Sequence, residues 1–317
     1  MNLPANVNLE ETACPLCNEY NDVVITAGRD LLYDKSGDFT VVQCRTCELM
    51  RTNPRPTLDT IGYYYPDDYG PYIGTRVRDS TSLSGVKKFI QAAVRRITDP
   101  NSVKLPPLVP GRMLEIGCAS GAFLHEMAGK GWQVQGVEFS EKAALAASRL
   151  GYQVHTGPLE TAPSPDHQFD LIVGWMVLEH LHDPINSLRK LREWSKPGAW
   201  LALSVPNAGS LEFRLFQDKW YALQLPTHLY HFTPQSLEKT LQAGGWTLEK
   251  VYHQRTLSNF IGSLGWVLRG KGHARLSQKF IDFPEKSGLY TYIFYPLALL
   301  CSFFGQTGRM TIWAKKK

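Results

Sequence analysis

The segment Met113–Leu124 constrains the fold of this chain most, because an apolar strand pattern runs through a glycine-punctuated turn into a helix pattern. The apolar run before the turn is typical of a buried strand. Gly117 and Gly121 bracket the turn, where backbone amides and the positive end of the following helix can face a ligand. The segment therefore predicts a cofactor pocket at the end of a strand.

The spacing of small residues in this turn disfavours a dinucleotide as the ligand. A dinucleotide-binding turn has glycine at its first and third places and glycine or alanine at its sixth. Those places hold Gly117, Ala119 and Ala122 here, and Gly121 is out of register. The methyl group of Ala119 would stand where a diphosphate needs bare backbone.

The same turn resembles the first motif of class I S-adenosylmethionine-dependent methyltransferases, which reads acidic-x-Gly-x-Gly-x-Gly. Glu115, Gly117 and Gly121 match the motif, and Ala119 departs from it at the middle glycine. The resemblance implies that this turn, with Cys118 inside it, binds S-adenosylmethionine. It also implies a Rossmann-like α/β fold with a seven-stranded sheet whose last strand is reversed.

From Arg112 onward, strand and helix patterns alternate, which predicts a largely parallel sheet covered by helices on both faces. Ser140, Asp183 and Thr233 are suited to cap the helices that follow them. The expected strands are Met113–Ile116, Gln133–Glu138, Tyr152–Thr156, Phe169–Trp175, Trp200–Val205, Trp246–His253 and Met310–Ala314. The expected helices are Ala122–Lys130, Glu141–Leu150, Pro184–Trp194 and Pro234–Ala243. We assign residues 111–317 to this domain, with insertions at 206–233 and 255–305.

Residues 1–50 carry two Cys-x-x-Cys pairs, Cys14 with Cys17 and Cys44 with Cys47. Two such pairs can hold one tetrahedral zinc ion in a closed, structural site. The alternating pattern between the pairs fits the hairpins of a zinc ribbon. Disulfides are the alternative, but a reducing cytoplasm disfavours them, and the first residues show no secretory signal. We therefore expect a cytoplasmic protein with an N-terminal zinc ribbon.

Residues 51–110 form a connector rich in proline and aromatic residues. The pattern at Val86–Ile97 predicts an amphipathic helix. Two roles are open for the tyrosines at positions 63–65, 69 and 72: they can line a substrate pocket above the cofactor or pack between the two modules.

Carboxylate and apolar residues after the second and third strands suit nucleoside binding. Glu138, followed by Phe139, ends the second strand, where a carboxylate can accept both ribose hydroxyls. The resemblance places an adenine contact at Leu159. A surface glutamate that caps the next helix is the alternative role for Glu138.

The fourth strand and its exit, Phe169–Pro184, match the second diagnostic segment of the methyltransferases. The carboxyl end of a parallel strand places Trp175, Met176, Glu179 and His180 near the transferred methyl group. Glu179 and His180 either take part in catalysis or order the loop and touch the donor. The exit lacks the (Asp/Asn)-Pro-Pro-aromatic motif of nucleic-acid amine methyltransferases, which disfavours base amines as acceptors.

The insertion that holds Pro226–Leu237 resembles the Thr-His…Phe…Pro…Leu segment of ubiquinone-pathway O-methyltransferases. It also resembles the Glu-His…Tyr-Phe-Ser segment of zinc-ribbon sugar C-methyltransferases, with Thr227 in place of the glutamate. An imidazole suits proton removal from a hydroxyl acceptor. We expect His228 to be the general base, supported by Tyr230 or His231. A core histidine that ties the insertion to the sheet is the alternative.

Residues 269–304 combine the basic residues Arg269, Lys271, Arg275 and Lys279 with the apolar, aromatic run Leu289–Phe304. The run is shorter than the ~20 residues that span a bilayer. It suits peripheral contact with the inner face of a membrane or a lid over a lipid-linked acceptor. A helix buried against the sheet or in a dimer contact is the alternative.

Together these patterns predict a zinc-containing methyltransferase that uses S-adenosylmethionine. The resemblance favours a hydroxyl, or secondly a carbon, of a sugar, a surface-polysaccharide precursor or another lipid-linked small molecule as acceptor. An RNA-modifying enzyme that grips with its ribbon is disfavoured, because residues 1–50 hold three basic residues against eight acidic ones. A non-catalytic scaffold that binds the donor is a third hypothesis.

Overall fold

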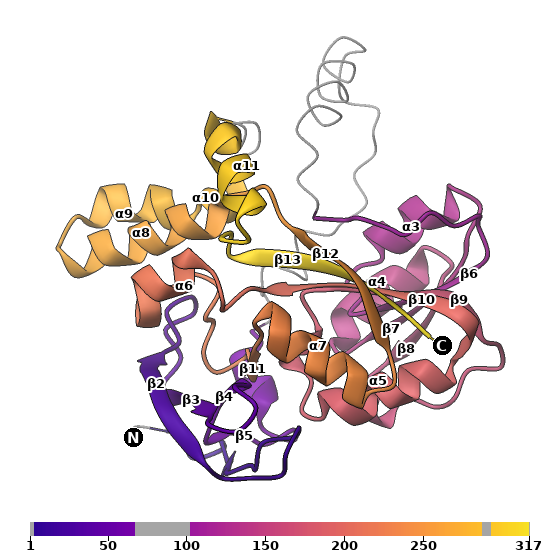
Figure 1. Ribbon diagram of the computed structural model, residues 1–317, viewed down its shortest axis with the longest axis horizontal. Helices are drawn as coiled ribbons and strands as arrows, with labels where there is room; N and C mark the ends of the chain where they lie inside the picture. Colours follow the sequence, from indigo (N-terminus) through magenta and orange to yellow (C-terminus); the bar gives the residue numbers. More distant parts are fainter. Residues whose placement is uncertain (1–2, 67–101, 287–292, 317) are drawn as a thin grey trace.

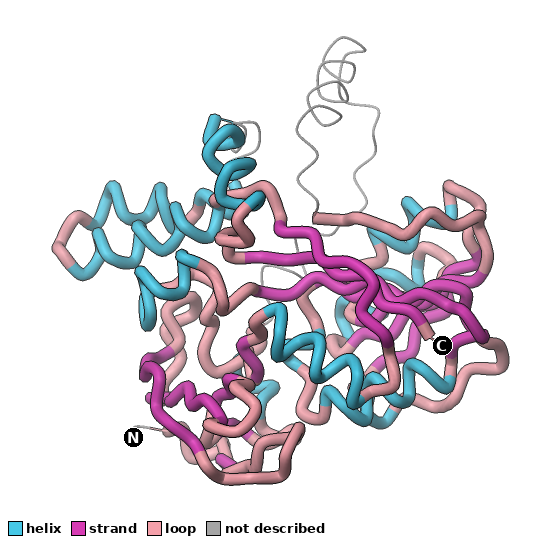
Figure 2. Tube along the Cα trace, viewed as in Figure 1, coloured by secondary structure: helices cyan, strands magenta, loops and turns pink. Residues whose placement is uncertain are grey.

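A seven-stranded sheet forms the centre of the protein in the computed structural model, which describes residues 3–66, 102–286 and 293–316 (Figures 1 and 2). The strand order is β12-β13-β10-β9-β6-β7-β8. β13 runs antiparallel to both of its neighbours, whereas the five strands from β10 to β8 are parallel. This confirms the predicted Rossmann-like sheet with a reversed last strand. The bounds are β6 Arg112–Ile116, β7 Gln133–Glu138, β8 Gln153–Thr156, β9 Phe169–Trp175, β10 Ser195–Pro206, β12 Thr247–His253 and β13 Arg309–Lys315.

Helices cover both faces of the sheet because its central strands are apolar on both sides. Leu114 of β6 belongs to one buried cluster with Leu188 of α5. Its neighbour Met113 belongs to another with Leu124 of α3, since successive strand residues point to opposite faces. The bounds are α3 Ala122–Ala128, α4 Glu141–Arg149, α5 Pro184–Glu193 and α7 Pro234–Ala243.

Three side-chain caps fix where helices begin beside the loops of the site. Ser140 accepts a hydrogen bond from the backbone N–H of Ala143, and Asp183 accepts one from Asn186. Thr233 forms a capping box with Ser236. The three predicted caps are therefore confirmed.

The N-terminal module contains a second sheet, in the order β11-β4-β3-β2. Its edge strand β11 (Tyr230–His231) comes from the predicted insertion at 206–233 and pairs antiparallel with β4. β1 (Leu9–Glu10) pairs with β5 (Arg55–Pro56) in a small separate sheet. Through β11, the N-terminal module thus shares a sheet with a segment far along the chain. The remaining bounds are β2 Asp22–Arg29, β3 Asp38–Cys44 and β4 Met50–Thr52.

The segment between β12 and β13 folds into a helical extension, α8 to α11 (Figure 1). α8 and α9 approach closely at Gly265, where a Cβ atom would lie 2.7 Å from both the backbone N and Cγ1 of Ile281. In the described residues, no helix is both long and apolar enough to cross a bilayer. The predicted helix Val86–Ile97 and residues 289–292 lie outside those residues. The bounds are α6 Leu211–Phe216, α8 Ser258–Gly270, α9 Ala274–Ile281, α10 Phe283–Lys286 and α11 Tyr295–Phe303.

Candidate active site

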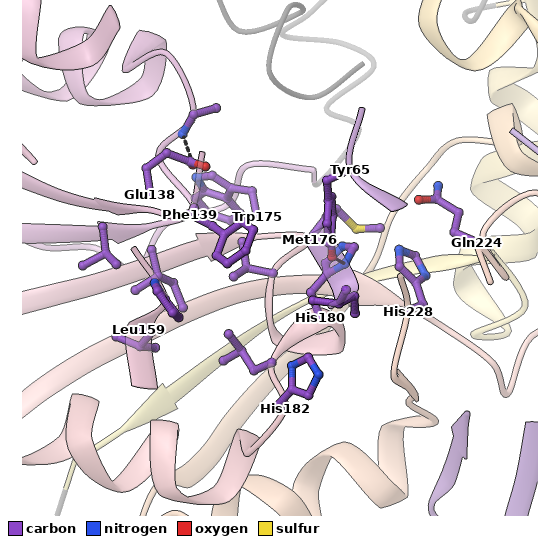
Figure 3. Close-up of a pocket in the computed structure, with 18 of the residues that line it drawn as sticks. Tyr65, Glu138, Phe139, Leu159, Trp175, Met176, His180, His182, Gln224 and His228 are labelled. Atoms are coloured by element: carbon purple, nitrogen blue, oxygen red, sulfur yellow. Dashed lines mark hydrogen bonds between the residues drawn. The ribbon is translucent and has the colours of Figure 1, made fainter. Parts of the chain in front are cut away.

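A cavity of about 490 Å³ opens at the carboxyl ends of β6, β7 and β9 (Figure 3), the edge where open parallel sheets bind ligands. Its wall brings together nine of the predicted residues, from four loops and the insertion. They are Gly117, Ala119, Glu138, Phe139, Leu159, Trp175, Met176, His180 and His228. The other predicted residues of the site lie behind this wall: Glu115, Cys118, Gly121, Glu179 and Tyr230.

The glycine turn has a left-handed backbone at three places, with φ of 66° at Gly117, 45° at Ala119 and 81° at Gly121. A Cβ atom at Gly117 would lie 2.5 Å from Cγ2 of Val177, and one at Gly121 would lie 2.9 Å from Cβ of Ala147. Both glycines are therefore needed for close packing as well as for conformation. Ala119 adopts the same conformation at a cost of about 1 kcal/mol, so the departure from the motif leaves the shape of the turn intact.

Glu138 joins this turn to the end of β7. Its Oε2 accepts a hydrogen bond from the backbone N–H of Ala119, and its Oε1 accepts one from Ser140, both at 2.8 Å. Burial raises the pKa of this carboxyl, and the two N–H groups act in the opposite direction. Each carboxylate oxygen has a second lone pair, so Glu138 can also accept the hydroxyls of a ribose.

A second carboxyl, that of Glu115, lies beneath the turn rather than in the cavity. Its side chain is buried, and burial raises its pKa well above the ordinary value. Burial thus favours the protonated form of Glu115, and its side chain is not part of the cavity wall.

The exit of β9 bends sharply so that Trp175 and Met176 face the cavity. Met176 has a φ of 60°, which is rare for a residue with a side chain. Its backbone N–H donates to the carbonyl of Ser204 at 2.8 Å. A strained, well-anchored backbone at the switch point of the sheet is a feature typical of functional sites.

His180 follows this exit and is held in one tautomer. Its Nδ1 lies 2.9 Å from the carbonyl oxygen of Thr227, which can only accept, so Nδ1 carries the proton. The Tyr65 hydroxyl lies 2.8 Å from the same nitrogen. Burial lowers the pKa of His180 to about 4, so its imidazole is neutral with an unprotonated Nε2.

His228 is held in the same tautomer by a different carbonyl. Its Nδ1 donates to the backbone oxygen of Ala222 at 2.9 Å, which leaves the lone pair on Nε2. Its ring lies edge-on to that of His180, with centroids 4.6 Å apart. Burial, followed by the nearby imidazoles, holds the pKa of His228 well below its ordinary value. His228 is thus a neutral imidazole that can accept a proton through Nε2.

Tyr230 and His231 connect the His228 segment to the N-terminal module. The Tyr230 hydroxyl accepts a hydrogen bond from Arg55 at 3.1 Å and donates one to the carbonyl of His182 at 3.2 Å. His231 Nε2 lies 3.1 Å from the Thr52 hydroxyl. Neither side chain is part of the cavity wall, so both act from outside it.

Two groups of side chains are spaced to hold a metal ion. The thiols of the N-terminal module, Cys14, Cys17, Cys44 and Cys47, lie within 4.8 Å of one another. Individual sulfur separations are 3.2, 3.4 and 3.9 Å, close to the ~3.8 Å edges of a tetrahedral zinc–thiolate site. The ligand atoms of Glu179, His180 and His228 also lie within 4.8 Å of one another.

The cavity wall includes residues that the motifs did not identify. Tyr65, Gln224 and Arg309 line the cavity beside the two histidines. The tyrosine cluster is a signal for Tyr65, which lines the cavity, whereas Tyr64 packs in a buried cluster that joins Val41 of the N-terminal module to Trp220 of the insertion. Arg309 begins a strand far along the chain, and no local pattern indicates it. Tyr69 and Tyr72 lie outside the described residues.

Figure 3 shows two ends of this cavity. Glu138, Phe139, Leu159 and Trp175 lie toward one end, and Tyr65, Met176, His180, Gln224 and His228 lie toward the other. The first group suits a nucleoside. The second surrounds the place where a group carried by that nucleoside would meet an acceptor.

Sequence comparison agrees with this geometry. A family model described as a methyltransferase domain matches residues 86–251, just over half of the chain. The ubiquinone biosynthesis O-methyltransferase of Nitrosospira multiformis is 28% identical in an alignment of 202 positions that covers 54% of this chain and 84% of that protein. The mitochondrial ubiquinone biosynthesis O-methyltransferase of Schizosaccharomyces pombe is 29% identical in an alignment of 208 positions that covers 61% of this chain and 67% of that protein.

Structural comparison shows the same fold. The crystal structure of the [4+2]-cyclase SpnF superposes with a TM-score of 0.51 at 18% sequence identity. The match covers 83% of this chain and 97% of the cyclase.

Proposed function

Because the chain belongs to the methyltransferase domain family and takes its methyl group from S-adenosylmethionine, we propose that its acceptor is a hydroxyl group of a lipid-linked or saccharide-type small molecule. The observation that carries this proposal is the unprotonated Nε2 of His228 in the wall of the cavity, at the end opposite the nucleoside residues. An oxygen acceptor must lose a proton as it attacks, and a fixed neutral imidazole suits that task.

In the proposed reaction, S-adenosylmethionine supplies an electrophilic methyl group on a sulfonium centre. Glu138 holds the ribose, the turn from Gly117 to Gly121 presents its amides, and Phe139 and Leu159 flank the base. His228 takes the hydroxyl proton while the acceptor oxygen bonds to the methyl carbon and the carbon–sulfur bond breaks. A methyl ether, S-adenosylhomocysteine and a protonated His228 result, and the imidazolium then returns its proton to solvent.

Apolar side chains in the cavity wall support an acceptor with an apolar body. Leu32, Tyr33, Tyr221 and Pro284 belong to this wall, and Leu32 and Tyr221 also line a small neighbouring cavity with Gln224. We infer that Gln224 and the histidines orient the hydroxyl-bearing head, and that the apolar residues surround the rest. This favours a lipid-linked hydroxyl compound over a free nucleotide sugar or surface-polysaccharide precursor. The relatives named as O-methyltransferases favour oxygen over carbon as the acceptor atom.

A screen with labelled S-adenosylmethionine against lipid extracts, nucleotide sugars and RNA tests the acceptor class. We expect label in the lipid fraction, and label in RNA alone would contradict the proposal. Donor binding with no transfer to any fraction would favour the non-catalytic scaffold.

Substitution tests the role of His228. His228→Ala should lower turnover about 100-fold or more, with the Kd of S-adenosylhomocysteine within about threefold of the original. His167→Ala, at an exposed loop histidine, is the matched control and should change neither quantity. Unchanged turnover in His228→Ala would remove the assignment of the base.

A further inference from the structure

Helix α11 and the residues around it expose an unusually continuous apolar surface. Leu297, Leu300 and Phe303 are 53%, 56% and 83% exposed. Across residues 293–304, Ala298 is the one buried side chain, and the sequence contains no charged residue. Ile293, Phe294, Leu299 and Phe304 are also exposed. Contiguous exposed apolar surface of this kind marks a contact site.

Positive charge accompanies this apolar surface on the same helical extension. The described residues 258–284 contain four basic residues, Arg269, Lys271, Arg275 and Lys279, against the single acidic residue Asp282. All four basic residues are exposed. The extension that carries the apolar helix α11 therefore also carries excess positive charge, on α8, on α9 and in the turn between them.

The extension is packed against the rest of the protein, so this surface is not part of a loose tail. On one side, α8 contacts α6 and residues 217–219. Figure 1 shows α9 and α11 on the other side, away from the N-terminal sheet. The rings of Phe283 in α10 and Phe294 before α11 meet with centroids 6.0 Å apart, and the Tyr295 hydroxyl lies 3.4 Å from Nη1 of Arg255.

We propose that α9 and α11 form a docking surface for an anionic membrane. Apolar side chains can enter the boundary between headgroups and acyl chains, while basic side chains remain at the headgroups. A symmetric dimer through this surface would set the same patch against itself. The basic residues of the two copies would then face one another with few acids to offset them, so charge complementarity favours anionic lipid over a second copy.

A ring contact links the docking surface to the cavity. Pro284 of α10 lines the cavity, and its neighbour Phe283 packs against Phe294 before α11. A docked enzyme would therefore hold the Pro284 wall of its cavity toward the bilayer. The docking surface does not depend on the identity of the acceptor.

Co-sedimentation of the full-length, zinc-loaded protein with lipid vesicles tests this proposal. The protein should bind phosphatidylcholine vesicles that contain phosphatidylglycerol far better than vesicles of phosphatidylcholine alone. The double variant Leu300→Glu/Phe303→Glu should lower the partition coefficient at least about 100-fold. Arg275→Gln/Lys279→Gln should lower it about 30-fold, because each basic residue near an anionic surface contributes about fivefold.

Matched controls come from the opposite part of the molecule. Leu145 and Val109 are 52% and 84% exposed, so Leu145→Glu/Val109→Glu also replaces two apolar side chains by glutamate, at nearly the same exposure. Lys142→Gln/Arg149→Gln on α4 matches the charge variant. Both controls should bind vesicles like the original protein.

Three results would overturn the docking surface. The original protein could fail to bind anionic vesicles, or the α11 variant could bind them as well as its control. Alternatively, sedimentation velocity could show a dimer that Leu300→Glu/Phe303→Glu dissociates, without vesicle binding by either protein. Because the readout is vesicle binding, each of these results would leave the proposed methyl transfer standing.

Discussion

Thr52→Val tests whether the N-terminal module positions the proposed catalytic base. The Thr52 side chain is buried, and its hydroxyl donates to the backbone carbonyl of His228 at 2.7 Å. The Thr52 hydroxyl has one hydrogen, and this hydrogen points to the His228 carbonyl. The hydroxyl oxygen therefore accepts a hydrogen bond from Nε2 of His231 at 3.1 Å. Valine keeps the shape of the residue and removes both interactions.

The expected cost follows from the two groups left without partners. A buried donor or acceptor that loses its partner costs about 1 to 3 kcal/mol, so the variant should lose roughly 2 to 5 kcal/mol in unfolding free energy. Thr240→Val is the matched control, because Thr240 is equally buried but its hydroxyl donates to a carbonyl of its own helix, that of Ser236, at 2.8 Å. That control should lose only about 1 kcal/mol.

Urea unfolding, calorimetry and turnover measure the separate consequences. The Kd of S-adenosylhomocysteine should stay within about threefold, because Gly117 and Glu138 are unchanged, whereas turnover should fall about tenfold or more as His228 shifts. If Thr52→Val matches Thr240→Val in both stability and turnover, the module does not position the base and this reasoning is refuted.

Three further predictions test the donor site, the buried histidines and the thiol cluster. Glu138→Ala should raise the Kd of S-adenosylhomocysteine about 30-fold or more, and a change below threefold in calorimetry would contradict ribose binding. Burial lowers the pKa of His231 to about 3. As the pH falls below about 6.5, this imidazole is therefore protonated in the unfolded chain but stays neutral in the folded protein, and stability is lost. His231→Gln should therefore remove about 1.4 kcal/mol of the stability difference between about pH 7.5 and 5.5 in urea unfolding, and an unchanged pH dependence would argue against a neutral buried imidazole. Metal analysis should find zinc in the original protein and none in Cys44→Ser. Turnover of Cys44→Ser should be abolished, since metal coordination supplies much of the folding energy of such modules; full activity without zinc would contradict a structural role for the ion.

The central sheet was predictable because its strands and caps are encoded locally. The predicted bounds of Gln133–Glu138 and Phe169–Trp175 match β7 and β9, and the side chains of Ser140 and Thr233 make the expected caps. By contrast, the bounds of α8 and α9 were not predicted. Gly265 of α8 packs against Ile281 and Gly262 packs against Tyr221, so part of the buried face of α8 consists of glycine rather than of large apolar residues.

The candidate site also has a part that the sequence predicts and a part that it does not. The glycine turn and Glu138 follow from short motifs, because their geometry is set by neighbours in sequence. The hydrogen bonds of Tyr65 to His180 and of Thr52 to the His228 carbonyl join residues more than a hundred positions apart. Such pairings depend on how the N-terminal module docks, and a two-residue strand such as β11 is too short to leave a recognisable pattern.

The pairing of β11 with β4 limits how the gene for this enzyme can recombine with related genes. The chain passes from the N-terminal module to the central sheet, returns to the module for the two residues of β11, and leaves again. A single genetic crossover between relatives would therefore join β11 to an N-terminal sheet with which it had not evolved. Exchange of the N-terminal module by simple gene fusion should be rare in this lineage, and the two parts should diverge together.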